Sequence, residues 1–189
     1  MESSKGLNIP EQRILLRLAR EAIRTSLYSK YQMIPAVTFD PQLQKKCGVF
    51  VTLRLESELR GCIGFSFATY PLAEAVQEAA VSAAFHDLRF SPLQLNEFEK
   101  IEVEISVLTQ PYLIQPQEIQ VGIHGLIIRE NAKMGLLLPQ VAIEHQWSKE
   151  TFLEQTCLKA GLAKDAWKRK AEVLAFEAQI LSENHLSGF

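Results

Sequence analysis

The sequence predicts an α+β protein in which a mixed or antiparallel sheet is flanked by helices. Several stretches repeat apolar residues every three to four positions, as amphipathic helices do, and others alternate apolar and polar residues, as half-buried strands do. Strand pairs joined by short polar turns predict hairpins, and hairpins mixed with helices favour the α+β class. No internal repeat, low-complexity tract or flexible linker divides the 189 residues, so a single domain over 1–189 is expected.

The first half predicts a helix, a hairpin and a second helix. Residues 9–31 carry apolar side chains at helical spacing, and Asn8 can cap their start. A proline-containing loop follows. Residues 47–66 predict two strands around a polar turn at 56–58, and an alanine-rich helix is expected over 72–86.

The second half predicts three more strands and one helix. Residues 100–109 alternate as a third strand, and residues 125–138 predict a hairpin that turns at the letters NAKMG. Ser148 is placed to cap a helix that Gly161 ends. A last strand is expected over 172–181.

Composition narrows the classes of function. Apolar residues make up 47% of the chain and charged residues 22%, which is ordinary for a domain with a buried core. The net charge of −2 gives no basic field that would attract nucleic acid. Neither a secretory signal nor an apolar run long enough to span a bilayer is present, so a cytoplasmic protein without membrane contact is expected.

The cysteines and histidines predict no metal site. Cys47, Cys62 and Cys157 are an odd number at unrelated spacings, which favours free thiols in a reducing cytosol. The four histidines are far apart in the sequence, and no phosphate-binding glycine motif occurs. Neither a metal nor a cofactor is therefore expected.

The hexapeptide LRGCIG at Leu59–Gly64 is the first candidate site. Side chains alternate along a strand, so Arg60, Cys62 and Gly64 should share a face, with Arg60 roughly 6–7 Å from Cys62 along the strand. A nearby cation favours the thiolate that a nucleophilic cysteine needs, and Gly61 and Gly64 leave space for a ligand. The spacing alone favours the alternative, a buried structural cysteine whose glycines permit close packing or a bulge.

Other polar side chains allow both functional and structural interpretations. Asp87 and Arg89, in the loop after the second helix, can orient a thiol or can simply pair with each other. Glu104 belongs to a carboxylate pair on the third strand, a pattern that solvated strand faces also have. His124 is flanked by glycines that permit close ligand approach, although a lone loop histidine is more often structural.

Through LRGCIG the chain also resembles the AMMECR domain family, called AmmeMemoRadiSam system protein A in prokaryotes. Further matching blocks follow in the family's order and cover most of the chain. They are Ala84 with DLRFSPL at 87–93, EVEISVL at 102–108, GIHGL at 122–126, LLPQVA at 137–142, Phe152-Leu153, CLKAGL at 157–162, Trp167 and the closing strand with Phe176. The match ends at about Glu183, so residues 184–189 are expected to form a C-terminal tail.

The resemblance implies an α+β fold of two unequal, intertwined subdomains, with LRGCIG near a cleft between them. It also implies an association, at least genomic, with Memo-like proteins and radical S-adenosylmethionine enzymes. The matching blocks hold more polar residues than packing needs, which favours a shared site. These residues are Arg60, Cys62, Asp87, Arg89, Glu104, His124 and Gln140.

Two functions are therefore hypothesised. In a thiol-dependent enzyme, Cys62 would be the nucleophile or redox-active thiol, and His124 or Glu104 would move protons. In a non-catalytic binding or scaffold module, the cleft would hold a peptide or metabolite or dock a Memo-like partner. A nucleic-acid regulator fits poorly with the charge. The expected binding residues are Arg60, Gly61, Gly64, Asp87, Arg89 and Gln140.

Overall fold

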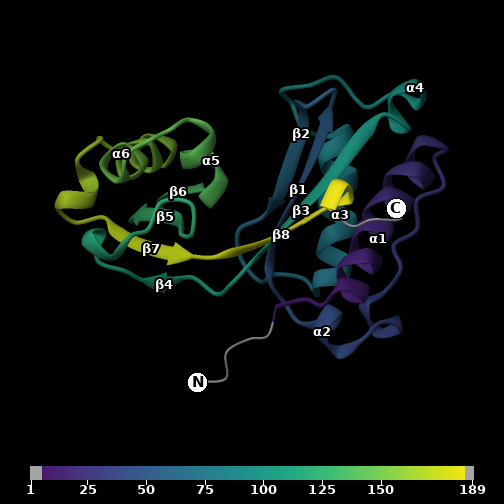
Figure 1. The fold of residues 1–189 in the computed structure, drawn as a ribbon, viewed down its shortest axis with the longest axis horizontal. Helices are drawn as coiled ribbons and strands as arrows, with labels where there is room; N and C mark the ends of the chain where they lie inside the picture. Colours follow the sequence, from purple (N-terminus) through teal and green to yellow (C-terminus); the bar gives the residue numbers. More distant parts are fainter. Residues whose placement is uncertain (1–5, 186–189) are drawn as a thin grey trace. The chain divides into compact units, whose positions relative to one another are not determined.

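Figure 1 shows the fold in a computed structural model, which describes residues 6–185. The chain forms two compact units. The larger unit runs up to Val107 and resumes at Gln179, and the smaller unit spans Leu108–Ala178. Each unit contains one four-stranded sheet together with helices, which confirms the predicted α+β class. Within residues 6–185, no helix combines the length and apolar character that crossing a membrane requires.

Two long helices of the larger unit pack against each other, α1 (Ile9–Leu27) and α3 (Leu72–Phe85). The side chain of Asn8 accepts a hydrogen bond from the backbone N–H of Glu11, and the Glu11 carboxylate accepts one from the N–H of Asn8. This capping box confirms the predicted start of the first helix. The shorter helices of this unit are η1 (Ala36–Thr38), α2 (Pro41–Gln44), α4 (Leu95–Phe98) and η4 (Glu183–His185).

The sheet of the larger unit has the strand order β2-β1-β3-β8, so β2 and β8 are its edge strands. Helix α3 packs on β1 and β2, and its run of alanines allows a close approach. Val51 of β1 and Val103 of β3 are fully buried in the core beneath these helices. The strands are β1 (Gly48–Leu55), β2 (Glu58–Phe65), β3 (Ile101–Leu108) and β8 (Ala178–Ser182).

The β1–β2 hairpin fixes which residues lie opposite Cys62. Its two turn residues, Glu56 and Ser57, both have positive φ, as a two-residue hairpin turn of type I′ requires. Thr52 of β1 lies directly opposite Cys62. A β-bulge lies beside this pair. Leu53 pairs with Gly61, but Arg54 pairs with Leu59. Arg60 therefore has no partner residue on β1 and is the extra residue of β2. The predicted alternation therefore holds from Gly61 onward and is interrupted at Arg60.

The smaller unit has a sheet with the strand order β4-β7-β5-β6. Helix α6 packs on β5 and β6, and α5 packs on β5. The core includes the fully buried side chains of Leu126 and Phe152. The elements are β4 (Tyr112–Leu113), η2 (Pro116–Glu118), β5 (Gly125–Glu130), β6 (Lys133–Leu137), α5 (Pro139–Glu144), α6 (Lys149–Lys159), η3 (Ala166–Lys168) and β7 (Glu172–Phe176).

The last predicted strand is in fact two strands. β7 ends at Phe176 and pairs with β5 and β4, whereas β8 begins at Ala178 and lies in the other sheet, beside β3. The chain changes sheets at Glu177, whose backbone groups bond to Thr109. The alternation of apolar residues continues through this point, so the sequence pattern did not reveal the break. In the predicted tail, residues 184 and 185 belong to η4, and residues 186–189 lie outside the described part.

Candidate functional site

The Cys62 side chain lies on edge strand β2 and is partly buried. Its sulfur accepts a hydrogen bond from the hydroxyl of Thr52, with an Oγ1–Sγ distance of 3.3 Å. Thr52 is 6% exposed, so this donor is shielded from water. A hydroxyl that donates to sulfur stabilises negative charge there. Thr52 was absent from the residues proposed from the sequence, because only the hairpin register reveals that it faces Cys62.

The backbone of Cys62 is held by a side-chain ion pair from the loop after α3. The Cys62 N–H donates to Asp87 Oδ2 at 2.9 Å, and the guanidinium of Arg89 donates to the Cys62 carbonyl at 3.1 Å. These backbone groups belong to an edge strand, where a neighbouring strand would otherwise bind them. Asp87 and Arg89 therefore close the edge of the sheet at the residue that carries the thiol.

The ion pair between Asp87 and Arg89 shifts the pKa values of both groups. Arg89 Nε and Nη2 donate to the two carboxylate oxygens of Asp87 at 2.9 and 2.6 Å. These bonds, together with those from the backbone N–H groups of Cys62 and Arg89, lower the pKa of Asp87 to about 2, although its burial acts in the opposite direction. The pKa of Arg89 is raised, first by its hydrogen bonds to Asp87 and to a lesser extent by its electrostatic interaction with Cys62. The Arg89 guanidinium is thus a cation that lies at the backbone carbonyl of Cys62.

Arg60, the cation expected to favour the thiolate, is bound to another partner. Its Nε and Nη2 donate to the two carboxylate oxygens of Glu97 at 2.8 and 3.0 Å. The pKa of Glu97 is lowered, chiefly by these hydrogen bonds. The side chains are 12% and 21% exposed, so this bidentate pair is largely sheltered and ties β2 to α4.

The two glycines of LRGCIG serve close packing inside the larger unit. A Cβ on Gly61 would lie 2.1 Å from the backbone oxygen of Ala83, so the absence of a side chain lets α3 approach the sheet. A Cβ on Gly64 would lie 2.1 Å from the carbonyl oxygen of Val49 and 2.6 Å from the ring of Phe50, which pairs with Gly64 across the strands. The predicted use of these glycines as space for a ligand stays a prediction.

Glu104 lies on β3 between the fully buried side chains of Val103 and Ile105. Because side chains alternate along a strand, Glu104 points to the face of the sheet opposite α3. Cys62 points to that face as well, since its neighbour Gly61 faces α3. The two side chains are therefore on the same face of one sheet, on strands separated by β1.

The remaining predicted site residues, His124 and Gln140, belong to the smaller unit. His124 is 8% exposed. Its Nδ1 accepts a hydrogen bond from the backbone N–H of Gln120 at 3.2 Å, so the neutral ring carries its proton on Nε2, 3.3 Å from the hydroxyl of Tyr112. Gln140 lies in the first turn of α5. The proton-transfer role of His124 stays a prediction.

The other two cysteines have different surroundings from Cys62. Cys157 on α6 is fully buried, and burial raises the pKa of its thiol. Burial is also the main cause of the raised pKa of Cys47. In the described part of the chain, no group of three or more His, Cys, Asp and Glu side chains is arranged to hold a metal ion.

Comparison with known proteins identifies the family. Residues 16–181 match the family model described as AMMECR1. A protein of Pyrococcus furiosus is 45% identical over 186 residues, covering 92% of this chain and 89% of the relative, and one of Methanosarcina barkeri is 43% identical over 187 residues, covering 94% and 93%. The crystal structure of an uncharacterized protein from Pyrococcus horikoshii is similar, with a TM-score of 0.83, 44% identity and 88% of each chain covered. The chain therefore belongs to the AMMECR1 family, as the LRGCIG hexapeptide and the blocks that follow it predicted.

Proposed function

We propose that this protein is a thiol-dependent enzyme in which Cys62 is the reacting group. The observation that carries the proposal is the Thr52 hydroxyl, which is buried and donates to the Cys62 sulfur. A nucleophilic cysteine reacts as the thiolate, and a hydrogen-bond donor together with a nearby cation stabilises that form. Thr52 and Arg89 are suited to these two tasks.

In the proposed reaction, the Cys62 thiolate attacks the carbonyl carbon of an ester or amide in a small molecule or modified peptide. A C–S bond forms while the C–O or C–N bond breaks, the alcohol or amine leaves with a proton, and water then hydrolyses the thioester and restores the thiol. Glu104, which lies on the same face of the sheet as Cys62, is the proposed group that moves protons. Memo-like and radical S-adenosylmethionine proteins are the proposed partners that supply or consume the substrate. The resemblance to the AMMECR family supports this partnership, and the polar surroundings of Cys62 support the thiol chemistry.

Alkylation of the three cysteines tests the thiol chemistry. The native protein is treated with iodoacetamide for increasing times, and each cysteine-containing peptide is quantified by mass spectrometry. We expect Cys62 to react at least about tenfold faster than Cys47 and Cys157, whose raised pKa values disfavour the thiolate. A Cys62→Ser variant controls for labelling elsewhere. Equal rates for Cys62 and Cys47 would contradict a reactive Cys62.

The alternative, a binding or scaffold module, is favoured by a different observation. Asp87, Arg89 and Arg60 already form ion pairs within the protein, and Gly61 and Gly64 already receive neighbouring backbone. A site whose charged side chains are already paired within the protein can present a fixed binding surface without performing a reaction. Co-purification with a Memo-like protein separates the alternatives: a scaffold keeps its partner in Cys62→Ser and loses it in Arg89→Glu, whereas loss in both variants would place Cys62 itself in the binding surface.

A further inference from the structure

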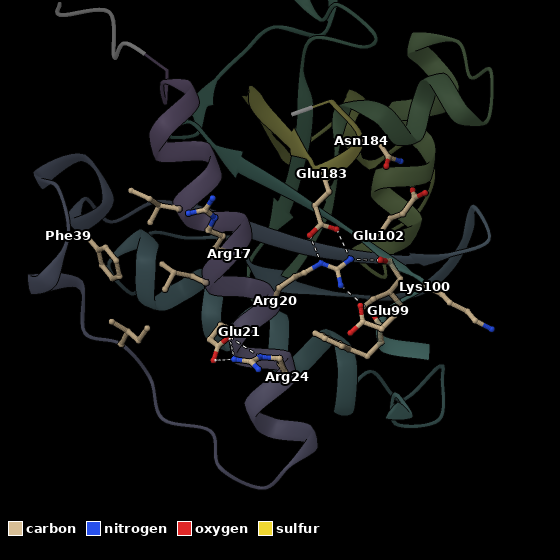
Figure 2. Close-up of a pocket in the computed structure, with 15 residues that line it drawn as sticks. Arg17, Arg20, Glu21, Arg24, Phe39, Glu99, Lys100, Glu102, Glu183 and Asn184 are labelled. Atoms are coloured by element: carbon tan, nitrogen blue, oxygen red, sulfur yellow. Dashed lines mark hydrogen bonds and ion pairs between the residues drawn. The ribbon is translucent and has the colours of Figure 1, made fainter. Parts of the chain in front are cut away.

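A pocket of about 1030 Å³ lies in the larger unit along α1, and Cys62 is not among the residues that line it (Figure 2). One wall comes from α1 and the loop that follows it, and the other from the end of α4, the start of β3 and η4. The proposed thiol chemistry makes no use of this pocket. Its volume is at the upper end of what small-molecule sites occupy, about 300–1,000 Å³.

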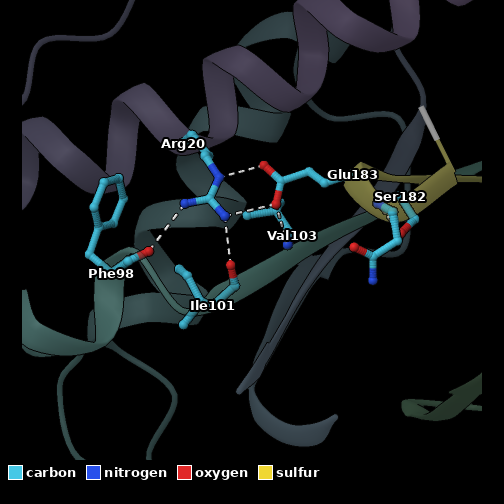
Figure 3. A network of polar contacts seen from close by, with 7 residues as sticks. Arg20, Phe98, Ile101, Val103, Ser182 and Glu183 are labelled. Carbon is cyan, nitrogen blue, oxygen red and sulfur yellow. Dashed lines mark hydrogen bonds and ion pairs between the residues drawn. The ribbon is translucent and has the colours of Figure 1, made fainter. Parts of the chain in front are cut away.

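Arg20, one of the residues that line the pocket, is the centre of a polar network (Figure 3). Its guanidinium donates to the Glu183 carboxylate and to the carbonyl oxygens of Phe98 and Ile101, at 3.1 and 2.6 Å for the two carbonyls. Glu183 also accepts the N–H of Val103 at 2.9 Å. This network joins α1, α4, β3 and η4, so it holds the two walls of the pocket together.

Two of the arginines that line the pocket form ion pairs with carboxylates. Arg20 is paired with Glu183, and Arg24 is paired with Glu21. Arg17 is exposed and, among residues 6–185, makes no side-chain hydrogen bond or ion pair. Figure 2 shows Arg17 on the side of the Arg20–Glu183 pair that also carries Phe39, whereas Glu102 and its neighbours lie on the other side.

The wall beside Arg17 is apolar. Ile14 and Leu18 are four residues apart on α1 and so lie on the same helix face, and Ile34 and Phe39 line the pocket from the loop after α1. A cation next to an apolar wall matches a ligand in which a carboxylate is attached to an apolar body. The carboxylate would form charge-assisted hydrogen bonds with Arg17, and the body would cover the apolar side chains.

We propose that this pocket binds a small carboxylate with an apolar chain or ring, held by Arg17. The proposal is independent of the thiol chemistry at Cys62. Each buried CH₂ group contributes about 0.8 kcal/mol, so affinity should increase with chain length.

Octanoate is the probe for this proposal, and amide chemical shifts of the ¹⁵N-labelled full chain are the readout. We expect saturable shifts on α1 and the loop up to Phe39, no such shifts with acetate, and at least fivefold weaker binding of the charge-reversed probe octylammonium. Arg17→Gln should weaken octanoate binding about five- to tenfold while leaving the spectrum of the free protein otherwise unchanged. Arg129→Gln removes an exposed arginine of the smaller unit and should leave the affinity unchanged.

Three results would overturn the proposal. The first is the absence of saturable shifts with octanoate. The second is equal binding of octanoate and octylammonium, which would show that apolar contact alone drives association. The third is equal affinity of the wild type and Arg17→Gln, which would remove the carboxylate contact on which the proposal depends.

Discussion

The carboxylate of Asp87 accepts a hydrogen bond of 2.9 Å from the backbone N–H of Cys62 and thereby joins the loop after α3 to the outer edge of β2. Arg89 completes the arrangement by donating to the Cys62 carbonyl. Two side chains thus take the place of a neighbouring strand at one residue. The position of the thiol depends on this loop as well as on the hairpin.

The Asp87 carboxylate should make stability dependent on pH in the acidic range. Its pKa is lowered from 3.8 to about 2 in the folded protein, so the ionised form stabilises the fold. This contribution is fully present above the unfolded pKa and is lost as the pH falls through about 2. Because Arg89 is 56% exposed, solvent screening limits the contribution to on the order of 1–2 kcal/mol.

Urea unfolding of Asp87→Asn between about pH 2 and pH 7 tests this prediction. The variant should be less stable than the wild type at neutral pH, and the difference should shrink below about pH 4. Asp165→Asn is the matched control, because Asp165 pairs with Arg169 on the surface, where both side chains are well exposed. Parallel pH profiles for the wild type and Asp87→Asn would contradict the prediction.

The Arg60–Glu97 pair should contribute more to stability than a surface ion pair. Its side chains are 12% and 21% exposed and bond through two N–H groups, whereas Arg129 and Glu172 are 46% and 50% exposed. We expect a coupling free energy of about 1–3 kcal/mol for the sheltered pair and below about 1 kcal/mol for the exposed pair. Double-mutant cycles with alanine at each position, measured by urea unfolding, provide both values. Equal coupling free energies for the Arg60–Glu97 and Arg129–Glu172 pairs would contradict the prediction that burial strengthens the first pair.

Gly61→Ala should destabilise the larger unit. The added methyl would lie 2.1 Å from the backbone oxygen of Ala83, and backbone can shift only by moving α3 or β2. We expect a loss of about 2–3 kcal/mol or more in the free energy of unfolding. Leu59→Ala, which trims a side chain that is 38% exposed on the same strand, should cost less than about 1 kcal/mol. A Gly61→Ala variant as stable as the wild type would mean that α3 and β2 are less closely packed than described.

Removing the Thr52 hydroxyl should slow the alkylation of Cys62. Valine keeps the shape of threonine but cannot donate to sulfur, and hydrogen bonds to charged groups contribute about 1.5–3 kcal/mol. Sulfur is a weaker acceptor, so we expect a rate about three- to tenfold lower in Thr52→Val. Thr52→Ser should restore most of the rate, and Cys47 should react equally in all three proteins. An unchanged Cys62 rate in Thr52→Val would show that the hydroxyl does not activate the thiol.

Local sequence patterns were sufficient to predict the main elements. The capping residue Asn8 marked the start of α1, and the alanine-rich stretch predicted α3. The positions of α6 and its cap at Ser148 were also predicted, and the Ser148 side chain accepts a hydrogen bond from the N–H of Thr151. These features depend on residues a few positions apart, so their physical causes are visible in the sequence.

Elements that depend on distant partners were less predictable. The two-residue strand β4 and helix α5 were not expected from the sequence. Arg60 was expected to share a face with Cys62 as a nearby cation, but its guanidinium forms two hydrogen bonds to Glu97, which lies 37 residues further along the chain. No local pattern encodes a pair at that separation.

The sequence by itself determined the α+β class, most helices and strands, and membership of the AMMECR1 family through LRGCIG and the blocks that follow it. Only the tertiary structure decided that the Thr52 hydroxyl contacts the Cys62 sulfur, that Asp87 and Arg89 bind the Cys62 backbone, and that the last strand divides at Glu177 between two sheets. The reason is physical. Periodicity reports which face of an element is buried, whereas strand register, bulges and loop contacts are set by pairing between segments that are distant in sequence.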